Sequence, residues 1–277
     1  MSQAADSSAL TAQGTAAYRQ QVEEAAAALP SDPARPAVGI LHDADVDRVL
    51  NPESAEATVS LTDIPHLPAT EGTLSTGIVG GNQPPAVGAA LAEKSKKTGR
   101  VVLSFFGDGS TNTGTFHESM NMASTLKVPL VAIIENNLYG MSVPFSGSEI
   151  DGTFCASNIE DIAVRAAAYS VPGMIVDGQD PAAVFLAVKK AAERARKENR
   201  MTIIEAKTYR WYGHSRSDPR AYRTKAEEKA WHERDPITVL RKRLMSEGLC
   251  TEEACDQIRD KAFATVEAAT EFAMNSP

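Results

Sequence analysis

Cysteine is scarce in this sequence of 277 residues, and so are long apolar runs. The three cysteines, Cys155, Cys250 and Cys255, have unrelated spacings, which excludes a zinc-finger pattern and a disulfide framework. No apolar run is long enough to span a bilayer, and the first residues lack the basic and apolar regions of a signal peptide. We therefore predict a cytoplasmic protein that does not enter a membrane.

Basic residues are also under-represented, since 28 Lys and Arg face 36 Asp and Glu and give a net charge of −8. An acidic total argues against broad binding to nucleic acids or anionic membranes. The acidic excess lies at the front, because residues 1–70 hold three arginines, no lysine, ten acidic residues and six of the fifteen prolines. We interpret residues 1–70 as an acidic, Pro/Ala-rich N-terminal arm with one helical pattern at 14–29.

The remaining residues, 71–277, alternate between short apolar runs and helical patterns. The apolar runs predict strands at 101–106, 130–135, 174–176 and 202–206. The helical patterns cover residues 84–97, 116–126, 158–169, 180–197, 224–246 and 252–274. Alternation of this kind predicts an α/β fold, a doubly wound and mostly parallel sheet with helices on both faces, followed by C-terminal helices.

Polar residues follow two consecutive predicted strands at the edge where ligands of parallel sheets bind. The first strand runs into Gly107-Asp108-Gly109-Ser110, and the next ends in Asn136-Asn137. The glycines let a backbone approach a phosphate, while carboxylate and amide oxygens are suitable ligands for magnesium. The residues alone therefore indicate a magnesium and phosphate site, although Asp108 taken singly has the alternative role of a helix cap.

The same residues resemble a known family. A Gly-Asp-Gly at 107–109, 26 further residues and then Asn136-Asn137 look like the thiamine-diphosphate signature. The surrounding text, FFGDGSTNTGTFHESMNMASTLKVPLVAIIENNLYG, resembles the α subunits of the E1 component of 2-oxo acid and acetoin dehydrogenase complexes. So do GIVGGNQPPAVGAALA upstream and IEAKTYRWYGHSRSDPRAYRTKAEE downstream, and together the resemblance covers residues 72–277.

The resemblance implies a set of ligands for Mg²⁺ and thiamine diphosphate. The side chains of Asp108 and Asn137 and the backbone carbonyl of Tyr139 match the metal ligands of the family. Gly109 and Ser110 match the positions whose backbone N–H groups hold the diphosphate. On this basis we expect the loops after the first two strands to form the cofactor site.

Three further residues take roles from the resemblance. Gly77 and Val79 match the main-chain segment that holds the aminopyrimidine ring, although taken alone the segment is a tight turn before a helix. His214 matches the catalytic histidine of a loop that covers the diphosphate, although a lone histidine is more often structural or solvated. That loop, residues 207–225, holds six basic residues and one acidic residue, which suits either a lid over an anionic ligand or a docking surface.

The implied function is that of an α subunit of a thiamine-diphosphate-dependent E1 dehydrogenase. Such an enzyme decarboxylates a pyruvate-like 2-oxo acid or cleaves acetoin and passes the fragment to a lipoyl-bearing E2 protein. The implied partner is an E1 β subunit in an α2β2 heterotetramer. The alternative is a non-catalytic or regulatory paralogue that keeps the fold and the metal site, because residues 1–70 do not resemble the Tyr-Arg, His-Gly and Met-His segments that precede this region in the family.

Overall fold

The computed structural model describes residues 39–40, 77–146 and 155–276. The helical pattern predicted at 14–29 and nearly all of the predicted arm lie outside these ranges. The described residues fall into two compact units. The first holds those up to Gly178 together with Ala182–Arg210, and the second holds Gln179–Pro181 and the residues from Trp211 onward.

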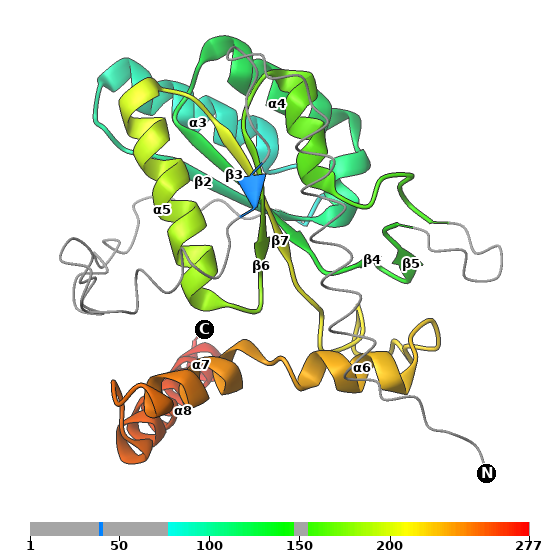
Figure 1. Cartoon of the computed structure of the whole chain (residues 1–277), viewed down its shortest axis with the longest axis vertical. Coiled ribbons are helices and arrows are strands. Elements are labelled where there is room, and N and C mark those ends of the chain that lie inside the picture. The colour runs from blue at the N-terminus through cyan, green and yellow to red at the C-terminus, as the bar shows by residue number, and fades with distance from the viewer. Residues whose placement is uncertain (1–38, 41–76, 147–154, 277) are drawn as a thin grey trace. The chain divides into compact units, whose positions relative to one another are not determined.

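The first unit is built on a parallel sheet of five strands in the order β1-β6-β7-β3-β2 (Figure 1). The strands are β1 Gly39–Ile40, β2 Val102–Gly107, β3 Leu130–Asn136, β6 Gly173–Asp177 and β7 Thr202–Lys207. The last four confirm the predicted strands, whereas β1 was not predicted. A short antiparallel pair, β4 Tyr139–Gly140 and β5 Val143–Pro144, follows β3.

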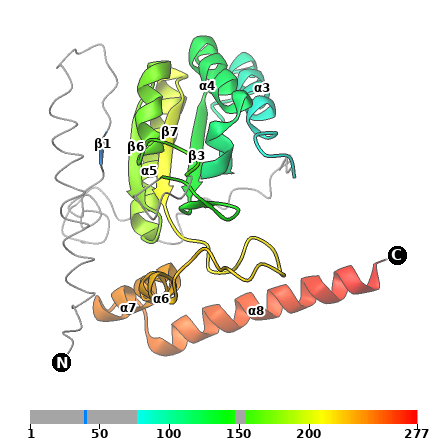
Figure 2. The ribbon, with the colours of Figure 1, turned by 90° about the vertical axis from the view of Figure 1, so that its right-hand side faces the viewer.

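Helices cover both faces of this sheet, as predicted. Helices α3 (Gln83–Lys96) and α4 (Gly114–Leu126) lie on one face, and α5 (Pro181–Glu198) lies on the other (Figure 2). The alternation of side chains along β3 shows why both faces are apolar: Leu130, Ala132 and Ile134 pack in one core cluster, and Val131 and Ile133 in the other.

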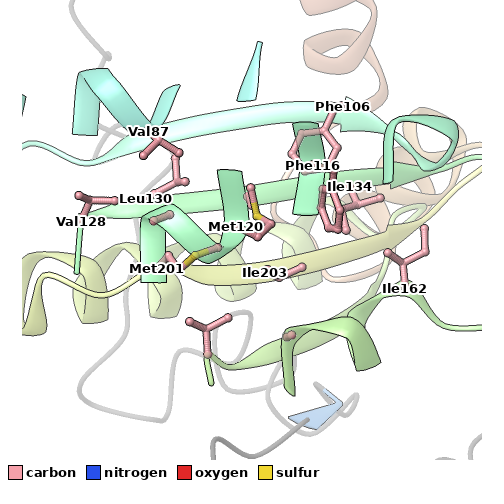
Figure 3. Close-up of a cluster of buried hydrophobic side chains, with 14 of the residues drawn as sticks. Val87, Phe106, Phe116, Met120, Val128, Leu130, Ile134, Ile162, Met201 and Ile203 are labelled. Atoms are coloured by element: carbon pink, nitrogen blue, oxygen red, sulfur yellow. The ribbon is translucent and has the colours of Figure 1, made fainter. Parts of the chain in front are cut away.

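The larger core cluster is mostly aliphatic, and α4 contributes two large side chains to it, Phe116 and Met120 (Figure 3). Phe116 is fully buried and meets Phe106 edge to face, with ring centroids 5.8 Å apart. Met120 on the next turn of α4 is also fully buried. This packing fixes α4 against the sheet and therefore fixes the loop that connects β2 to α4.

One predicted helix, residues 158–169, proves shorter. Only Ile162–Tyr169 is helical, as a 3-10 helix η2. Asp161 before it has extended backbone dihedrals, and Lys207 holds this segment by a hydrogen bond from Nζ to the Glu160 carbonyl (2.9 Å) and an ion pair with Asp161 (3.0 Å). Contact with the end of β7 thus overrides the helical pattern of residues 158–161.

The second unit contains three helices, α6 (Lys225–His232), α7 (Pro236–Ser246) and α8 (Glu252–Asn275). The prediction of one helix over 224–246 was wrong, because proline inside a helix removes a donor and clashes with the preceding turn. Pro236 instead begins α7, and Asp235 caps it by accepting the N–H groups of Ile237 (2.8 Å) and Thr238 (3.1 Å). Within the described ranges, no helix is long and apolar enough to cross a membrane.

Candidate functional site at the ends of strands β2 and β3

The carboxylate of Asp108 lies buried at the end of β2. The sheet register pairs Gly107 with Glu135, so Asp108 and Asn136 follow on neighbouring strands. Asp108 is 1% exposed, and its Oδ2 atom has no hydrogen-bond partner among the residues that the structure describes. A buried carboxylate oxygen without a partner is costly, and such a group in a native protein indicates a site that holds an ion or a ligand.

The electrostatic environment of Asp108 is consistent with a site that holds an ion or a ligand. Burial raises the pKa of the Asp108 carboxyl group to about 6, while the backbone N–H groups of Asp108, Asn137 and Gly109 and the Arg210 guanidinium act in the opposite direction. The Asn137 N–H therefore lies beside the Asp108 carboxylate. The alternative role of Asp108 as a simple cap is not what the structure shows, because Thr113 is the residue that caps α4.

The turn after β3 is organised by two asparagines. Asn136 Oδ1 accepts the Leu138 N–H (3.1 Å), and Asn137 Oδ1 accepts the Tyr139 N–H (3.2 Å). Leu138 has a φ of +73°, a left-handed conformation that a branched residue adopts only when its surroundings impose it. The turn therefore presents the Asn137 amide and the Tyr139 carbonyl in a fixed conformation.

A buried carboxylate, Glu205 on β7, supports this turn from the neighbouring strand. Glu205 is fully buried, and its Oε1 accepts hydrogen bonds from Asn136 Nδ2 (2.7 Å) and Lys207 Nζ (2.7 Å). Its Oε2 accepts the Ala163 N–H (2.8 Å). Burial tends to lower the pKa of Lys207, but Glu205 and Asp161 outweigh this effect and raise it, so Lys207 stays charged.

Sequence reasoning missed Glu205. The one signal for it was a charged residue in the middle of the apolar run Thr-Ile-Ile-Glu-Ala, where a carboxylate must have buried partners. Arg210 was noticed only as part of the basic loop. It donates from Nη2 to the Met141 carbonyl (2.7 Å) and from Nη1 to the Tyr139 carbonyl (3.4 Å), which brings a positive charge to the predicted metal ligand.

Gly109 and Ser110 lie in a short 3-10 helix, η1 (Asp108–Asn112), directly before α4. Thr113 joins the two helices, because its hydroxyl donates to the Ser110 carbonyl (2.8 Å) and accepts the Phe116 N–H (3.3 Å). A Cβ placed on Gly109 would come 3.7 Å from the Cα of Gly140 on β4. The predicted phosphate loop is thus a helix N-terminus that lies next to the turn after β3.

Gly77 and Val79 form a turn that leads into α3. The Gly81 N–H donates to the Ile78 carbonyl (2.9 Å), and Val79 is 67% exposed. A Cβ on Gly80 would lie only 2.5 Å from Thr115 Oγ1 and 2.8 Å from Thr113 Oγ1, so the turn lies against the start of α4. The segment is indeed a tight turn before a helix, and its role in holding a ring stays a prediction.

His214 belongs to the second unit. Its side chain is exposed, and its backbone N–H donates to Asp218 Oδ2 (2.8 Å). Asp218 also accepts the Tyr222 hydroxyl (2.6 Å) and the Arg220 N–H (2.8 Å), so one carboxylate organises this loop. The structure therefore brings together Asp108, Gly109, Ser110, Asn137 and Tyr139. The turn of Gly77 and Val79 reaches the start of α4 through Gly80, and His214 lies on a loop of the other unit.

These features define an α/β protein with a polar ligand site at adjacent strand ends. The profile of the family described as dehydrogenase E1 component matches residues 66–277, and the chain therefore belongs to that family.

Three relatives illustrate the similarity. The α subunit of acetoin:2,6-dichlorophenolindophenol oxidoreductase from Bacillus subtilis is 40% identical over 205 residues, which cover 73% of this chain and 58% of that protein. The pyruvate dehydrogenase E1 component α subunit of Rickettsia bellii is 38% identical over 201 residues, 73% of this chain and 59% of that protein. That of Rhizobium meliloti is 38% identical over 202 residues, covering 73% and 56%. The chain thus spans less than two thirds of the length of these relatives.

Proposed function

We propose that this chain acts as the α subunit of a thiamine-diphosphate-dependent E1 dehydrogenase. Membership of the dehydrogenase E1 component family supports the proposal, and the family implies thiamine diphosphate as cofactor. The observation that carries it is the buried Asp108 carboxylate, whose Oδ2 atom has no partner in the described part of the chain and lies next to the Asn137 turn. A magnesium ion bound to a diphosphate would neutralise this carboxylate.

The donor set fits a magnesium ion. Asp108 offers a carboxylate oxygen, Asn137 an amide oxygen and Tyr139 a carbonyl oxygen, which are hard ligands of the kind that Mg²⁺ takes together with phosphate oxygens and water. Asn137 Oδ1 accepts the Tyr139 N–H and the Tyr139 carbonyl accepts from Arg210, so both oxygens face the site as acceptors, and amide and carbonyl oxygens each carry two lone pairs. The set includes one acidic residue, and no group of three or more His, Cys, Asp or Glu that could hold a metal occurs within the described residues.

The residues of this chain would bind and orient the cofactor. Thiamine diphosphate, when bound, supplies a thiazolium carbon that attacks a carbonyl carbon and then accepts its electrons. Gly109 and Ser110, at a helix N-terminus, would donate backbone N–H groups to the diphosphate. Gly77 and Val79 would hold the aminopyrimidine ring by their main chain. His214 would act near the reacting carbon as a proton donor or hydrogen-bond donor.

The substrate and partners belong to the same proposal. We expect a pyruvate-like 2-oxo acid or acetoin as substrate, because one relative is named for acetoin and others for pyruvate. We expect an E1 β subunit in an α2β2 assembly and a lipoyl-bearing E2 protein that accepts the fragment. Residues 1–70 would form an arm outside the cofactor-binding domain of residues 71–277, and the protein would work in the cytoplasm.

A reconstitution assay tests this function. The chain is produced together with a candidate E1 β subunit, and reduction of an artificial electron acceptor is followed with pyruvate and with acetoin. We expect turnover that requires thiamine diphosphate and Mg²⁺ and that His214→Ala reduces at least tenfold. An assembled complex that binds the cofactor and turns over neither substrate would contradict the catalytic function and favour a regulatory paralogue.

A further inference from the structure

Two cysteine thiols lie in contact where helix α7 leads into α8. The proposed function does not use either of them. The Cys255 thiol donates a hydrogen bond to the sulfur of Cys250, and the two Sγ atoms are 3.3 Å apart. Both side chains are half-buried, so the pair is accessible from solvent. Sequence spacing gave no indication of a disulfide, and only the fold brings these two sulfurs together.

The backbone of Cys250 is fixed at the end of α7. The N–H groups of Leu249 (2.9 Å) and Cys250 (3.3 Å) both donate to the Leu244 carbonyl, which closes the last turn of the helix. Gly248 takes the left-handed conformation that this kind of helix end needs, with a φ of +69°. Cys250 therefore has a defined position relative to α7.

The backbone of Cys255 is fixed independently in the first turn of α8. Thr251 caps this helix by accepting the Ala254 N–H on Oγ1 (3.2 Å), and the Cys255 N–H donates to the Thr251 carbonyl (3.1 Å). Because separate helix ends hold the two cysteines, the proximity of their sulfurs is built into the α7–α8 connection. An S–S bond is about 2 Å long, so a small rotation of the side chains would bring the sulfurs into bonding distance.

A positive charge lies next to the pair. Arg241 on α7 forms an ion pair with Asp256 (2.8 Å), the residue that follows Cys255. The hydrogen bond to Cys250 and burial raise the pKa of the Cys255 thiol, whereas the Arg241 guanidinium acts in the opposite direction. The upward effects outweigh that of Arg241, so the thiolate form that attacks a disulfide becomes more populated as the pH rises.

We propose that Cys250 and Cys255 form a reversible intramolecular disulfide by exchange with a small disulfide of the glutathione type. One thiolate attacks the small disulfide, forms a mixed disulfide and releases one small thiol. The second cysteine, as thiolate, then attacks the mixed disulfide, forms the Cys250–Cys255 bond and releases the second small thiol. The two protein thiols lose two electrons and two protons, and the small disulfide gains them. The bond closes a ring over the first turn of α8. The α7–α8 connection then carries a cross-link that forms under oxidising conditions and is removed by reduction.

Thiol counting on the full chain tests the proposal. The reduced protein holds three titratable cysteines, and after equilibration with oxidised glutathione we expect one. Trypsin cleaves after Arg243 and Arg259, so both cysteines fall in the peptide 244–259. Without reduction this peptide should resist alkylation and weigh about 2 Da less than its dithiol form. Stable glutathione adducts, disulfide-linked dimers or three remaining thiols would each overturn the proposal.

Single variants supply the controls. Cys250→Ser removes the resolving thiol, so we expect a persistent glutathione adduct on Cys255. Cys155→Ser removes the third cysteine, which lies in the first unit, and should still form the disulfide and leave no free thiol. Circular dichroism of the reduced proteins confirms that each variant is folded. Loss of two thiols from Cys250→Ser would show that the reacting pair is a different one and would overturn the assignment.

Discussion

The Glu205 carboxylate accepts a 2.7 Å hydrogen bond from Asn136 Nδ2, and this contact joins β7 to the turn that carries the predicted magnesium ligands. Glu205 is fully buried and also pairs with Lys207 (2.7 Å). Asn136 in turn holds the Leu138 N–H on its Oδ1 atom. The conformation of the turn that carries the predicted metal ligands therefore depends on a carboxylate that does not itself belong to the predicted ligand set.

Glu205→Gln should destabilise the protein and weaken the site. Glutamine can still accept a hydrogen bond, but it removes one of the two negative charges that Lys207 faces and leaves Asp161 as the remaining ion-pair partner, so the cost is at the low end for a buried pair, about 3 kcal/mol. We expect the free energy of unfolding in urea to fall by that order, and the Kd for Mg²⁺ with thiamine diphosphate to rise at least tenfold.

The matched control for Glu205→Gln is Glu198→Gln, which breaks the exposed pair between Arg194 and Glu198 on α5 (3.1 Å). Exposed pairs of this kind contribute about 0–1 kcal/mol. Equal effects of the two substitutions would show that the Glu205 network does not organise the turn. A loss of stability without any change in cofactor affinity would limit Glu205 to a structural role.

Asp108 should make the metal-free protein less stable as the pH rises. Its pKa is raised by burial from 3.8 to about 6, so the folded state binds the proton more tightly than the unfolded state does. The stability that this proton contributes is present below about pH 4 and is lost as the pH rises through 6, and the full difference is about 3 kcal/mol. Asp108→Asn should therefore stabilise the metal-free protein at pH 8 and have little effect at pH 4.

Thermal unfolding of both proteins with a chelator present measures this difference. Asp260→Asn, at an exposed aspartate of α8, serves as the control and should change the midpoint little at either pH. If Asp108→Asn shifted the midpoint equally at pH 4 and pH 8, the Asp108 carboxyl group would not titrate as the burial argument requires.

Gly80→Ala should distort the turn that carries Gly77 and Val79. An alanine Cβ would lie 2.5 Å from Thr115 Oγ1, and the φ of +80° is strained for any L side chain. Gly99→Ala is the matched control, because Gly99 also has a positive φ (+73°) but has open space around its Cβ position. We expect the free energy of unfolding in urea to fall by about 1 kcal/mol in each variant, because alanine is strained at a positive φ. Gly80→Ala should lose roughly a further 1–3 kcal/mol because its Cβ meets the threonine hydroxyls. Equal losses would show that the turn does not pack tightly against α4.

Much of the fold could be predicted from the sequence because each strand is a short apolar run with turn residues on both sides. Because Asp108 and Asn137 follow two consecutive parallel strands, the sequence predicts that both lie at the same edge of the sheet. The break at Pro236 is predictable from the missing N–H of proline, although the helical pattern on either side of it favours one continuous helix. The unwinding of residues 158–161 was not predictable, because it depends on Lys207, which is distant in sequence.

The residues of the candidate site could be predicted only where they come directly after a strand. Asp108 and Asn137 stand directly after strands, so their types and positions indicate a metal site. Glu205 and Arg210 act through contacts with residues about 70 positions away in the sequence. Local sequence patterns do not predict which distant residues come into contact. The meeting of Cys250 and Cys255 likewise depends on how the ends of two helices are closed.

The proposed cofactor site depends above all on Asp108 as a ligand of the magnesium ion that accompanies thiamine diphosphate. Isothermal titration of the cofactor with Mg²⁺ into the chain, alone and with its β-type partner, tests this most directly. We predict saturable binding in the wild-type protein that requires Mg²⁺ and that Asp108→Ala weakens at least a hundredfold, while Asp260→Ala leaves it unchanged. Absence of binding in both preparations, or affinity that does not depend on Asp108, would contradict the account.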